Sequence, residues 1–255
     1  MLPELPIPSF TQLDPAPLVL VVCQVRHEPL NSVDPTPWFA VHTALRDLYP
    51  TIEPHVVHDV AVNVGPQGIQ TTGEPQHGFR LRSQDGAWTV ALLPQFFALE
   101  CTGYTRWTDF NSRFEQLMDA VSLHLKPRLE QRLGLRFVDQ LNPDGVRNVQ
   151  DWAGKLDDAV AGPLNHSALG PRISAIQSLV QFREGDFEAM LRHGVTPESP
   201  HYMIDTDCAR QGGRLFDKDQ ILEDTKKLHT LAVQVFQLCL RPEYLKTLEA
   251  KEGSS

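Results

Sequence analysis

The chain has 255 residues, of which 41% are hydrophobic and 22% are charged, so it can bury a core without disulfides or metals. Its formal net charge is -9, and no basic run exceeds the pair Lys226-Lys227. A protein that binds a nucleic-acid duplex neutralises several phosphates with Lys and Arg, and a membrane span needs about 20 apolar residues. Neither nucleic acid nor a membrane is therefore expected as a partner.

Both ends of the chain differ in composition from its middle. Residues 1–17 hold five prolines and are predicted to form a Pro-rich arm, whereas 250–255 are predicted to be a disordered tail. The prolines also interrupt the apolar stretch that a signal peptide needs. Cysteines lie far apart among apolar neighbours, which is typical of reduced and buried thiols: Cys23, Cys101, Cys208 and Cys239. These features predict a cytoplasmic location.

The first half of the chain, about 18–141, is predicted to form strands followed by a long helix. A helical stripe over 38–49 has Thr36 as its expected N-cap and Pro37 at its first position. Apolar residues spaced by three and four predict the long helix from Trp107 onward, capped by Thr105 or Thr108. Other predicted segments are a strand at 18–27, a strand at 55–64, a loop at 65–78, strands at 79–83, 88–93 and 96–104 with an Asp85-Gly86 hairpin turn, a helical stretch ended by Gly134, and a strand at 135–141.

The second half, about 142–249, repeats this order. Its predicted segments are a short helix at 152–160, strands at 173–182, 187–193 and 202–208 with a Gly185-Asp186 turn, a long helix at 218–240 and a short helix at 242–249. Asp217 and Gln220 resemble a capping box at the start of the long helix. The predicted fold class is α+β: antiparallel meander sheets with two long amphipathic helices packed on one face, in a single domain over 18–249 with pseudo-duplicated halves.

Asp205 and Asp207 are the sharpest candidates for a catalytic or metal site. Residues two apart on a strand point to the same face, so the two carboxylates could bind a divalent cation or act as an acid–base pair. His229, on the predicted long helix, and Glu100 could complete such a site. The alternatives are a solvated sheet face or ion pairs with Arg80 and Arg82, and for His229 a boundary histidine with a satisfied hydrogen bond.

Other polar motifs give weaker indications of chemistry. His55 and His58 are three apart, so on a strand they point to opposite faces and do not form a chelate. Cys101 lies in the middle of a predicted strand, away from a helix N-terminus that would activate its thiol. Arginines in or beside apolar strands are expected to pair with neighbouring carboxylates: Arg26, Arg136 and Arg183 with Glu28, Asp139 or Glu184. No phosphate-binding glycine motif is present in the sequence, and no cofactor is predicted.

Several segments together resemble one protein family. They are PLVLVVCQVRHEP, the block FRLRSQDGAWTVALLPQFFALECTGYTRWTDF, LGLRFVDQLN, and IDTD followed by a helix. Together these are similar to a sporadically distributed family of bacterial cytoplasmic proteins of about this length, whose members are generally labelled uncharacterised. The resemblance implies a bacterial, cytoplasmic origin. It supplies no catalytic residues, and a sporadic distribution would fit an accessory or mobile gene set.

Three functions follow from the sequence. The first is a non-catalytic interaction protein that docks a protein partner or a second copy of itself, with aromatic anchors such as Trp38, Trp88 and Trp107. The second is a small-ligand-binding protein with an apolar cavity between sheet and helix. The third is a metal-dependent hydrolase or nuclease using Asp205 and Asp207. The scarcity of polar clusters favours the first, and leaves enzymatic activity an open question.

Overall fold

The computed structural model of the protein describes residues 5–14, 16–30, 34–58, 61–65, 68–72, 75–184, 186–196 and 199–249. The side chains of residues 58, 61–65, 68–72 and 184 are not among those described. The predicted tail at 250–255 lies outside the described residues. So do residues 1–4 and 15 of the predicted arm, and Gly185 of the predicted turn.

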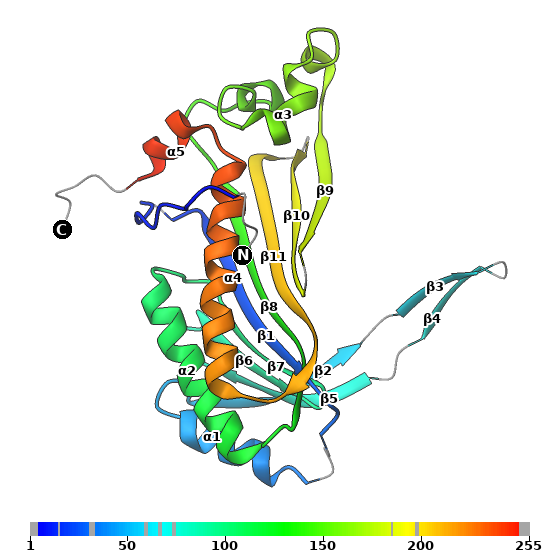
Figure 1. Ribbon diagram of the computed structural model, residues 1–255, viewed down its shortest axis with the longest axis vertical. Coiled ribbons are helices and arrows are strands. Elements are labelled where there is room, and N and C mark those ends of the chain that lie inside the picture. Colours follow the sequence, from blue (N-terminus) through cyan, green and yellow to red (C-terminus); the bar gives the residue numbers. More distant parts are fainter. Residues whose placement is uncertain are drawn as a thin grey trace.

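A single antiparallel sheet of nine strands forms the centre of the molecule (Figure 1). Its strand order is β2-β5-β6-β7-β1-β8-β11-β10-β9. The bounds are β1 Leu18–His27, β2 Thr51–His58, β5 Pro75–Arg82, β6 Trp88–Leu93, β7 Phe96–Cys101, β8 Leu129–Leu141, β9 Ile176–Glu184, β10 Phe187–Thr196 and β11 Ser199–Leu215. A separate hairpin of β3 (Ala61–Gly65) and β4 (Gly68–Thr72) extends away from this sheet (Figure 1). The mixed α/β class and the antiparallel sheet are as predicted.

The longest helix of the described residues, α4, runs along the middle of the sheet (Figure 1). It contacts β8, β10 and β11, and it also contacts α2, which in turn packs against α1. The helices are α1 Thr36–Leu45, α2 Trp107–His124, α3 Asp158–Asn165, α4 Lys218–Leu238 and α5 Pro242–Leu248, with 3-10 turns at Val149–Trp152 and Gly170–Arg172. No helix of the described part of the chain is long and apolar enough to span a membrane.

The alternation of strand residues explains where the core lies. On β8, Leu133, Leu135 and Phe137 are buried on the side that faces α4, and their register partners on β1 continue this apolar layer. Their partners on β11 are Arg210, Cys208 and Thr206, all of them buried. All four cysteines are free and buried in the core, as predicted. Burial raises the pKa of Cys101 to about 11 and that of Cys239 to about 12, so these thiols stay protonated at neutral pH.

Four predicted segments are wrong. The strand predicted at 55–64 is divided between β2 and β3, which lie in different sheets. The short helix predicted at 152–160 is instead a 3-10 turn that ends at Trp152 and α3, which begins at Asp158. The segment 65–78, predicted as a loop from its glycines and prolines, contains β4 and the start of β5, because Gly65 pairs with Gly68 to close a hairpin. The helical stretch does not continue to Gly134. Helix α2 ends at His124, Lys126 adopts a positive φ of 51°, and β8 already begins at Leu129. Pro127 cannot continue a helix, so the apolar residues beyond it follow a strand alternation instead.

The helix caps differ from the sequence prediction at two of three positions. Pro35 is the N-cap of α1, and Thr36 already lies inside that helix. Neither Thr105 nor Thr108 caps α2, because the Thr105 hydroxyl donates instead to the Asp109 carboxylate at 3.1 Å. Asp217 caps α4 as predicted: its carboxylate accepts a hydrogen bond of 3.0 Å from the backbone N–H of Gln220.

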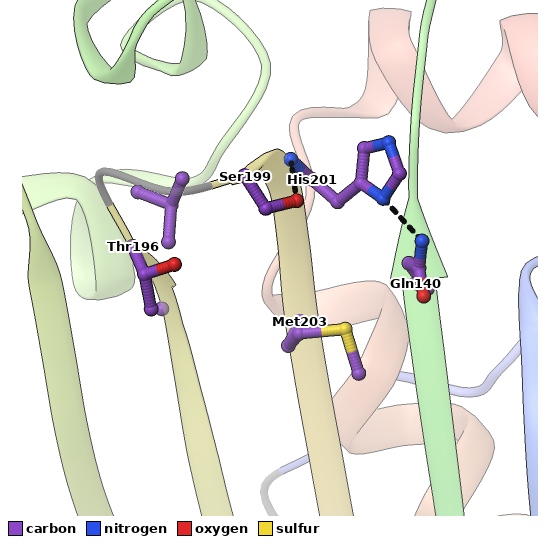
Figure 2. A pocket seen from close by; sticks show the side chains of 7 residues that line it. Gln140, Thr196, Ser199, His201 and Met203 are labelled. Carbon is purple, nitrogen blue, oxygen red and sulfur yellow. Dashed lines mark hydrogen bonds between the residues drawn. The ribbon is translucent and has the colours of Figure 1, made fainter.

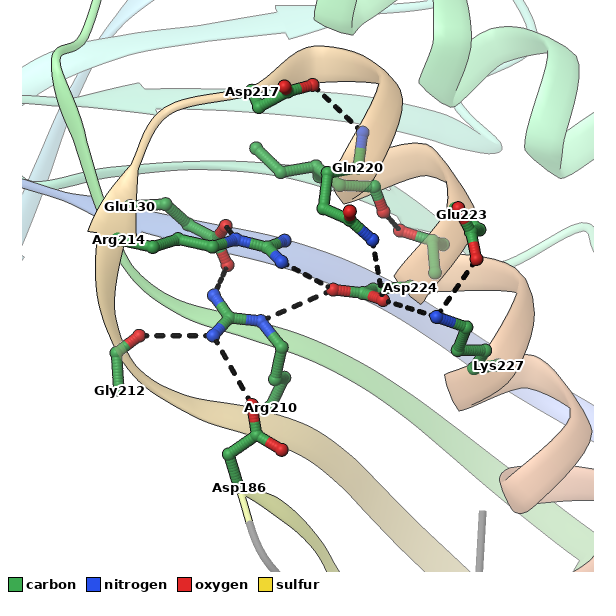
Figure 3. Close-up of polar contacts among 12 residues, drawn as sticks. Glu130, Asp186, Arg210, Gly212, Arg214, Asp217, Gln220, Glu223, Asp224 and Lys227 are labelled. Carbon is green, nitrogen blue, oxygen red and sulfur yellow. Dashed lines mark hydrogen bonds and ion pairs between the residues drawn. The ribbon is translucent and has the colours of Figure 1, made fainter.

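A buried ionic network ties β8, β11 and α4 together (Figure 3). Glu130 is fully buried and pairs with both Arg210 and Arg214, the latter at 2.7 Å between Nε and Oε2. Asp224 of α4 is 2% exposed and accepts from Arg214 Nη1 at 2.9 Å. A bulge at Gly212, whose φ is +97°, shifts the register of β11 between Gln211 and Arg214. Each charge has an opposite charge beside it, so we interpret the network as structural, although Arg210 Nε and Arg214 Nη2 have no hydrogen-bond partner among the described residues.

Candidate functional site

A cavity of about 690 Å³ lies between α4, the start of α2, β8 and the N-terminal segment. Its walls come from residues 9–13 and 16–18, the turn at 104–108, Phe137 and Asp139 of β8, and one side of α4 from Lys226 to Gln237. These segments are far apart in the sequence, and the cavity exists only because β8 and α4 pack against each other there. Its size falls within the range of cavities that hold small molecules in proteins.

Aromatic rings form much of the wall, and they surround His229. The ring of His229 stacks on Trp107 with the centroids 3.9 Å apart and the planes 6° apart. Phe10 of the N-terminal segment stacks beside His229 at 5.7 Å, and Phe137 approaches it edge-on at 5.9 Å. Burial lowers the pKa of His229 to about 4, so the ring is neutral at physiological pH. His229 therefore contributes a flat, uncharged surface to the cavity.

Asp139 is the one carboxylate in the described lining of this cavity. It projects from β8 on the same side as Leu135 and Phe137, and it is 3% exposed. No hydrogen bond or ion pair joins its carboxyl group to any residue that the structure describes, and burial raises the pKa of Asp139 well above its ordinary value. A buried carboxyl group without a partner is costly for a folded protein.

The N-terminal segment covers the cavity as a strap, which we define as residues 5–14. Gln237 of α4 holds it with two hydrogen bonds: its Nε2 donates to the carbonyl of Ser9 at 2.6 Å, and its Oε1 accepts from the Ser9 N–H at 3.0 Å. The Gln234 side chain donates to the carbonyl of Pro6 at 3.0 Å. At the far end of the strap, Asp14 donates its N–H to the carbonyl of Leu248 at 2.9 Å. Of the prolines that predicted an extended arm, Pro6 and Pro8 therefore belong to a segment fixed on α4.

Asp205 and Asp207 lie on the opposite face of the sheet from α4, and arginines pair with both. Asp205 accepts two hydrogen bonds from Arg136, at 2.7 and 2.8 Å, and contacts Arg192 at 3.3 Å. Asp207 accepts from Arg132 at 3.0 and 3.1 Å. The predicted alternative of ion pairs was correct in kind but not in partner, because Arg82 pairs with Glu53 and the Arg80 side chain contacts His55. Hydrogen bonding by Asp205 raises the pKa of Arg136, which is consistent with a fixed ion pair.

The structure does not bring the candidates of the third hypothesis together. Glu100 of β7 and Asp207 of β11 lie in one row of register partners, which passes through Val22 of β1 and Arg136 of β8. The two carboxylates therefore share a face of the sheet. They are three strands apart, which is about 14 Å at the usual spacing. His229 lies on the other side of the sheet, with α4. Among the described residues, no group of three or more His, Cys, Asp or Glu side chains could hold a metal ion.

Arginine pairing also differs from the sequence prediction. Arg136 was expected to pair with a neighbouring carboxylate such as Asp139, but the two residues point to opposite faces of β8, and Arg136 binds Asp205. Arg183 pairs with Glu188 at 2.8 Å. Sequence reasoning therefore assigned Asp139 a partner that the strand geometry excludes. Asp139 is an even number of residues from Leu135 and Phe137, so strand alternation places it on their side of β8. This spacing is the signal in the sequence that Asp139 lies in the core.

A smaller cavity of about 280 Å³ lies at the end of β10 and β11, on the face away from α4 (Figure 2). Gln140 and His201 line it and are hydrogen-bonded to each other, and the Ser199 hydroxyl accepts from the His201 backbone N–H at 3.3 Å. Gln140, Ser199 and His201 therefore have hydrogen-bond partners already. This cavity offers less room than the cavity at Asp139.

The fold and the larger cavity define a mixed α/β protein with a nine-stranded antiparallel sheet and a half-open pocket that has aromatic rings in its wall. Comparison with models of protein families gives no match, and comparison with curated proteins gives none either. The resemblance to a sporadic bacterial family stays a prediction from the sequence.

Proposed function

We propose that the protein binds a small molecule in the cavity beneath the strap. The observation that carries this proposal is the unpartnered Asp139 carboxyl group, which lies in the wall of an aromatic cavity of about 690 Å³. Folding alone does not favour such a group, whereas recognition of a ligand requires a few polar groups in an apolar pocket. Binding, without a chemical step, is the role that these residues support.

A fluorescent probe tests this function. N-phenyl-1-naphthylamine is neutral and apolar, and its emission increases when it enters an apolar cavity. We expect the protein to bind the probe, and we expect Val233→Trp, which fills the cavity from α4, to abolish binding. Leu238→Trp is the matched control, because Leu238 lies on the same helix outside the cavity and is 38% exposed. Failure of the protein to bind the probe, or equal binding by Val233→Trp, would refute the proposal.

A docking role is the second candidate, and the edge strand β9 favours it. In the described sheet β9 pairs only with β10, and its outer edge carries Leu179, which is 59% exposed, and Val180, which is 36% exposed. Exposed apolar edge strands tend to pair with other strands, and two identical edges can pair around a twofold axis. Under this proposal the protein is a dimer in solution. Light scattering that shows a monomer at all concentrations, for the protein and for Leu179→Lys alike, would exclude it.

Two finer points of the predicted architecture also remain proposals. We infer that the chain is pseudo-duplicated, supported by the order of its strands. One side of the sheet holds β1, β2, β5, β6 and β7, and the other side holds β8, β9, β10 and β11. In each set the first strand lies at the centre of the sheet, beside the last strand of that set. This repeat groups β8 with the second half, whereas the predicted halves 18–141 and 142–249 group it with the first.

The second point concerns the helices. We infer that α2 and α4 cover one face of the sheet, supported by their contact with each other. The cytoplasmic location and bacterial origin likewise remain proposals, supported by the sequence alone.

A further inference from the structure

The charge of the ligand can be inferred from the groups that surround Asp139. Its carboxyl group faces the cavity without a partner among the described residues, so a hydrogen-bond donor for it has to come from outside this part of the chain. We propose that the ligand is an organic amine, whose protonated nitrogen binds Asp139 while its apolar body fills the aromatic part of the cavity. This inference rests on the proposed binding function.

The aromatic wall supports a cationic ligand. Tyr104 and Phe137 lie next to each other with their ring centroids 6.1 Å apart, and both line the cavity together with Trp107. The faces of such rings carry partial negative charge and attract cations. An ammonium group beside Asp139 would therefore meet both a carboxylate and π-surfaces, whereas an anionic group would meet the Asp139 carboxyl group and no cation in the buried part of the described lining.

Every titratable group near Asp139 in the described chain is compatible with this assignment. Tyr104 and Cys239 lie near enough to interact electrostatically with Asp139, and burial raises the pKa of each, so both are neutral at physiological pH. His229 is neutral as well. The cations in the lining, Arg106 and Lys226, are exposed at the rim, where water and salt screen their charge. Among the residues that the structure describes, Asp139 is therefore the only group that can carry a charge at the buried end.

The protonation state of Asp139 gives the binding step a proton balance. Because burial favours the neutral acid in the unliganded protein, formation of the ion pair requires the Asp139 carboxyl group to release its proton to solvent. Amine binding should then release a proton at a pH below the native pKa of Asp139, and the affinity should increase with pH until that pKa is reached. A neutral ligand of the same shape would show neither effect.

Displacement of the neutral probe by two compounds of matched size tests the inference. In the protein, 2-phenylethylamine should displace N-phenyl-1-naphthylamine at a concentration at least about tenfold lower than 2-phenylethanol, because a charge-assisted pair is stronger than a neutral hydrogen bond. Asp139→Asn keeps the size of the side chain and should bring the two concentrations to within about twofold of each other. Asp144→Asn, at an exposed carboxylate, is the control and should preserve the preference.

The outcomes separate this inference from the proposed function. Equal displacement by amine and alcohol, no displacement by the amine, or a preference that persists in Asp139→Asn would overturn the amine assignment while probe binding remained intact. Loss of probe binding in the unmodified protein would instead refute the binding function itself. Calorimetry in two buffers of different ionisation enthalpy measures the released proton, and no proton release below the native pKa of Asp139 would also overturn the assignment.

Discussion

The buried position of Asp139 makes this residue a cost to the stability of the fold, and this cost can be measured. We expect Asp139→Asn to be more stable than the unmodified protein at neutral pH, and the difference to depend on pH. The Asp side chain has a pKa of about 3.9 in an unfolded chain, whereas burial raises the native pKa of Asp139 well above that value. Between these two pKa values the native state holds a proton that the unfolded state has released, so the free energy of unfolding falls as pH rises.

The size of this effect follows from the proton balance. Each pH unit inside the window removes about 1.4 kcal/mol from the free energy of unfolding, so two units remove about 2.7 kcal/mol. The neutral amide that Asp139→Asn introduces does not titrate, so the variant lacks this loss. In a chain of this size 1 kcal/mol shifts the melting temperature by about 2–4 °C, and two units should therefore separate the two melting temperatures by about 5–11 °C.

Urea unfolding at several values from about pH 4 to about pH 7 provides the assay. The free energies of unfolding of the two proteins should be close at the acidic end. As the pH rises, Asp139→Asn should become more stable than the unmodified protein. Asp144→Asn, at an exposed position, should show no such divergence. A constant difference between the unmodified protein and Asp139→Asn across this range would refute the reasoning, because it would mean that Asp139 is charged in the native state or paired within the fold.

Three further perturbations test other parts of the structure. Glu130→Gln should lower the free energy of unfolding in urea by about 3–5 kcal/mol, because it leaves Arg210 and Arg214 short of a charge partner. Trp107→Leu should raise the pKa of His229 from about 4 towards 6.5, measured by NMR titration, and an unchanged pKa would contradict the assigned stacking. Gly194→Ala should destabilise the β9–β10 pairing by about 1–3 kcal/mol in urea unfolding, since its Cβ would lie 2.0 Å from a backbone oxygen of β9, whereas Gly154→Ala should not.

The sequence predicts an element best where a turn, a cap or a proline marks its ends. Strand β6 was predicted with its observed bounds, because the Asp85-Gly86 turn precedes it and Pro94 follows it. Helix α4 was predicted to within two residues of its end, since Asp217 caps its start and its apolar stripe is continuous. The segment 65–78 gives the opposite result: its glycines predict a loop, but Gly65 and Gly68 close the β3–β4 hairpin.

The candidate site could be predicted only in part, because its residues come together through tertiary packing. His229 was identified from its position beside an apolar stripe, but its stacking on Trp107 depends on the contact between α2 and α4. Asp139 was missed because a carboxylate in a predicted strand was assumed to pair with an arginine. Applying the strand alternation from Leu135 would have placed it in the core. The strap could not be foreseen at all, since Gln234 and Gln237 bind it across most of the chain length.

The strap offers the least costly route into the cavity. The other walls belong to β8, α2 and α4, whose side chains are buried in the core, so movement of any of them would expose apolar surface. The strap packs only Leu5 and Leu13 partly against the core, whereas Ile7 is 95% exposed and Phe10 is 60% exposed. Hydrogen bonds at an exposed surface also hold it. Segments with few buried contacts open at a small fraction of the free energy of global unfolding. A ligand can therefore reach Asp139 while the sheet and α4 stay in place, and a ligand that contacts Phe10 would also hold the strap closed.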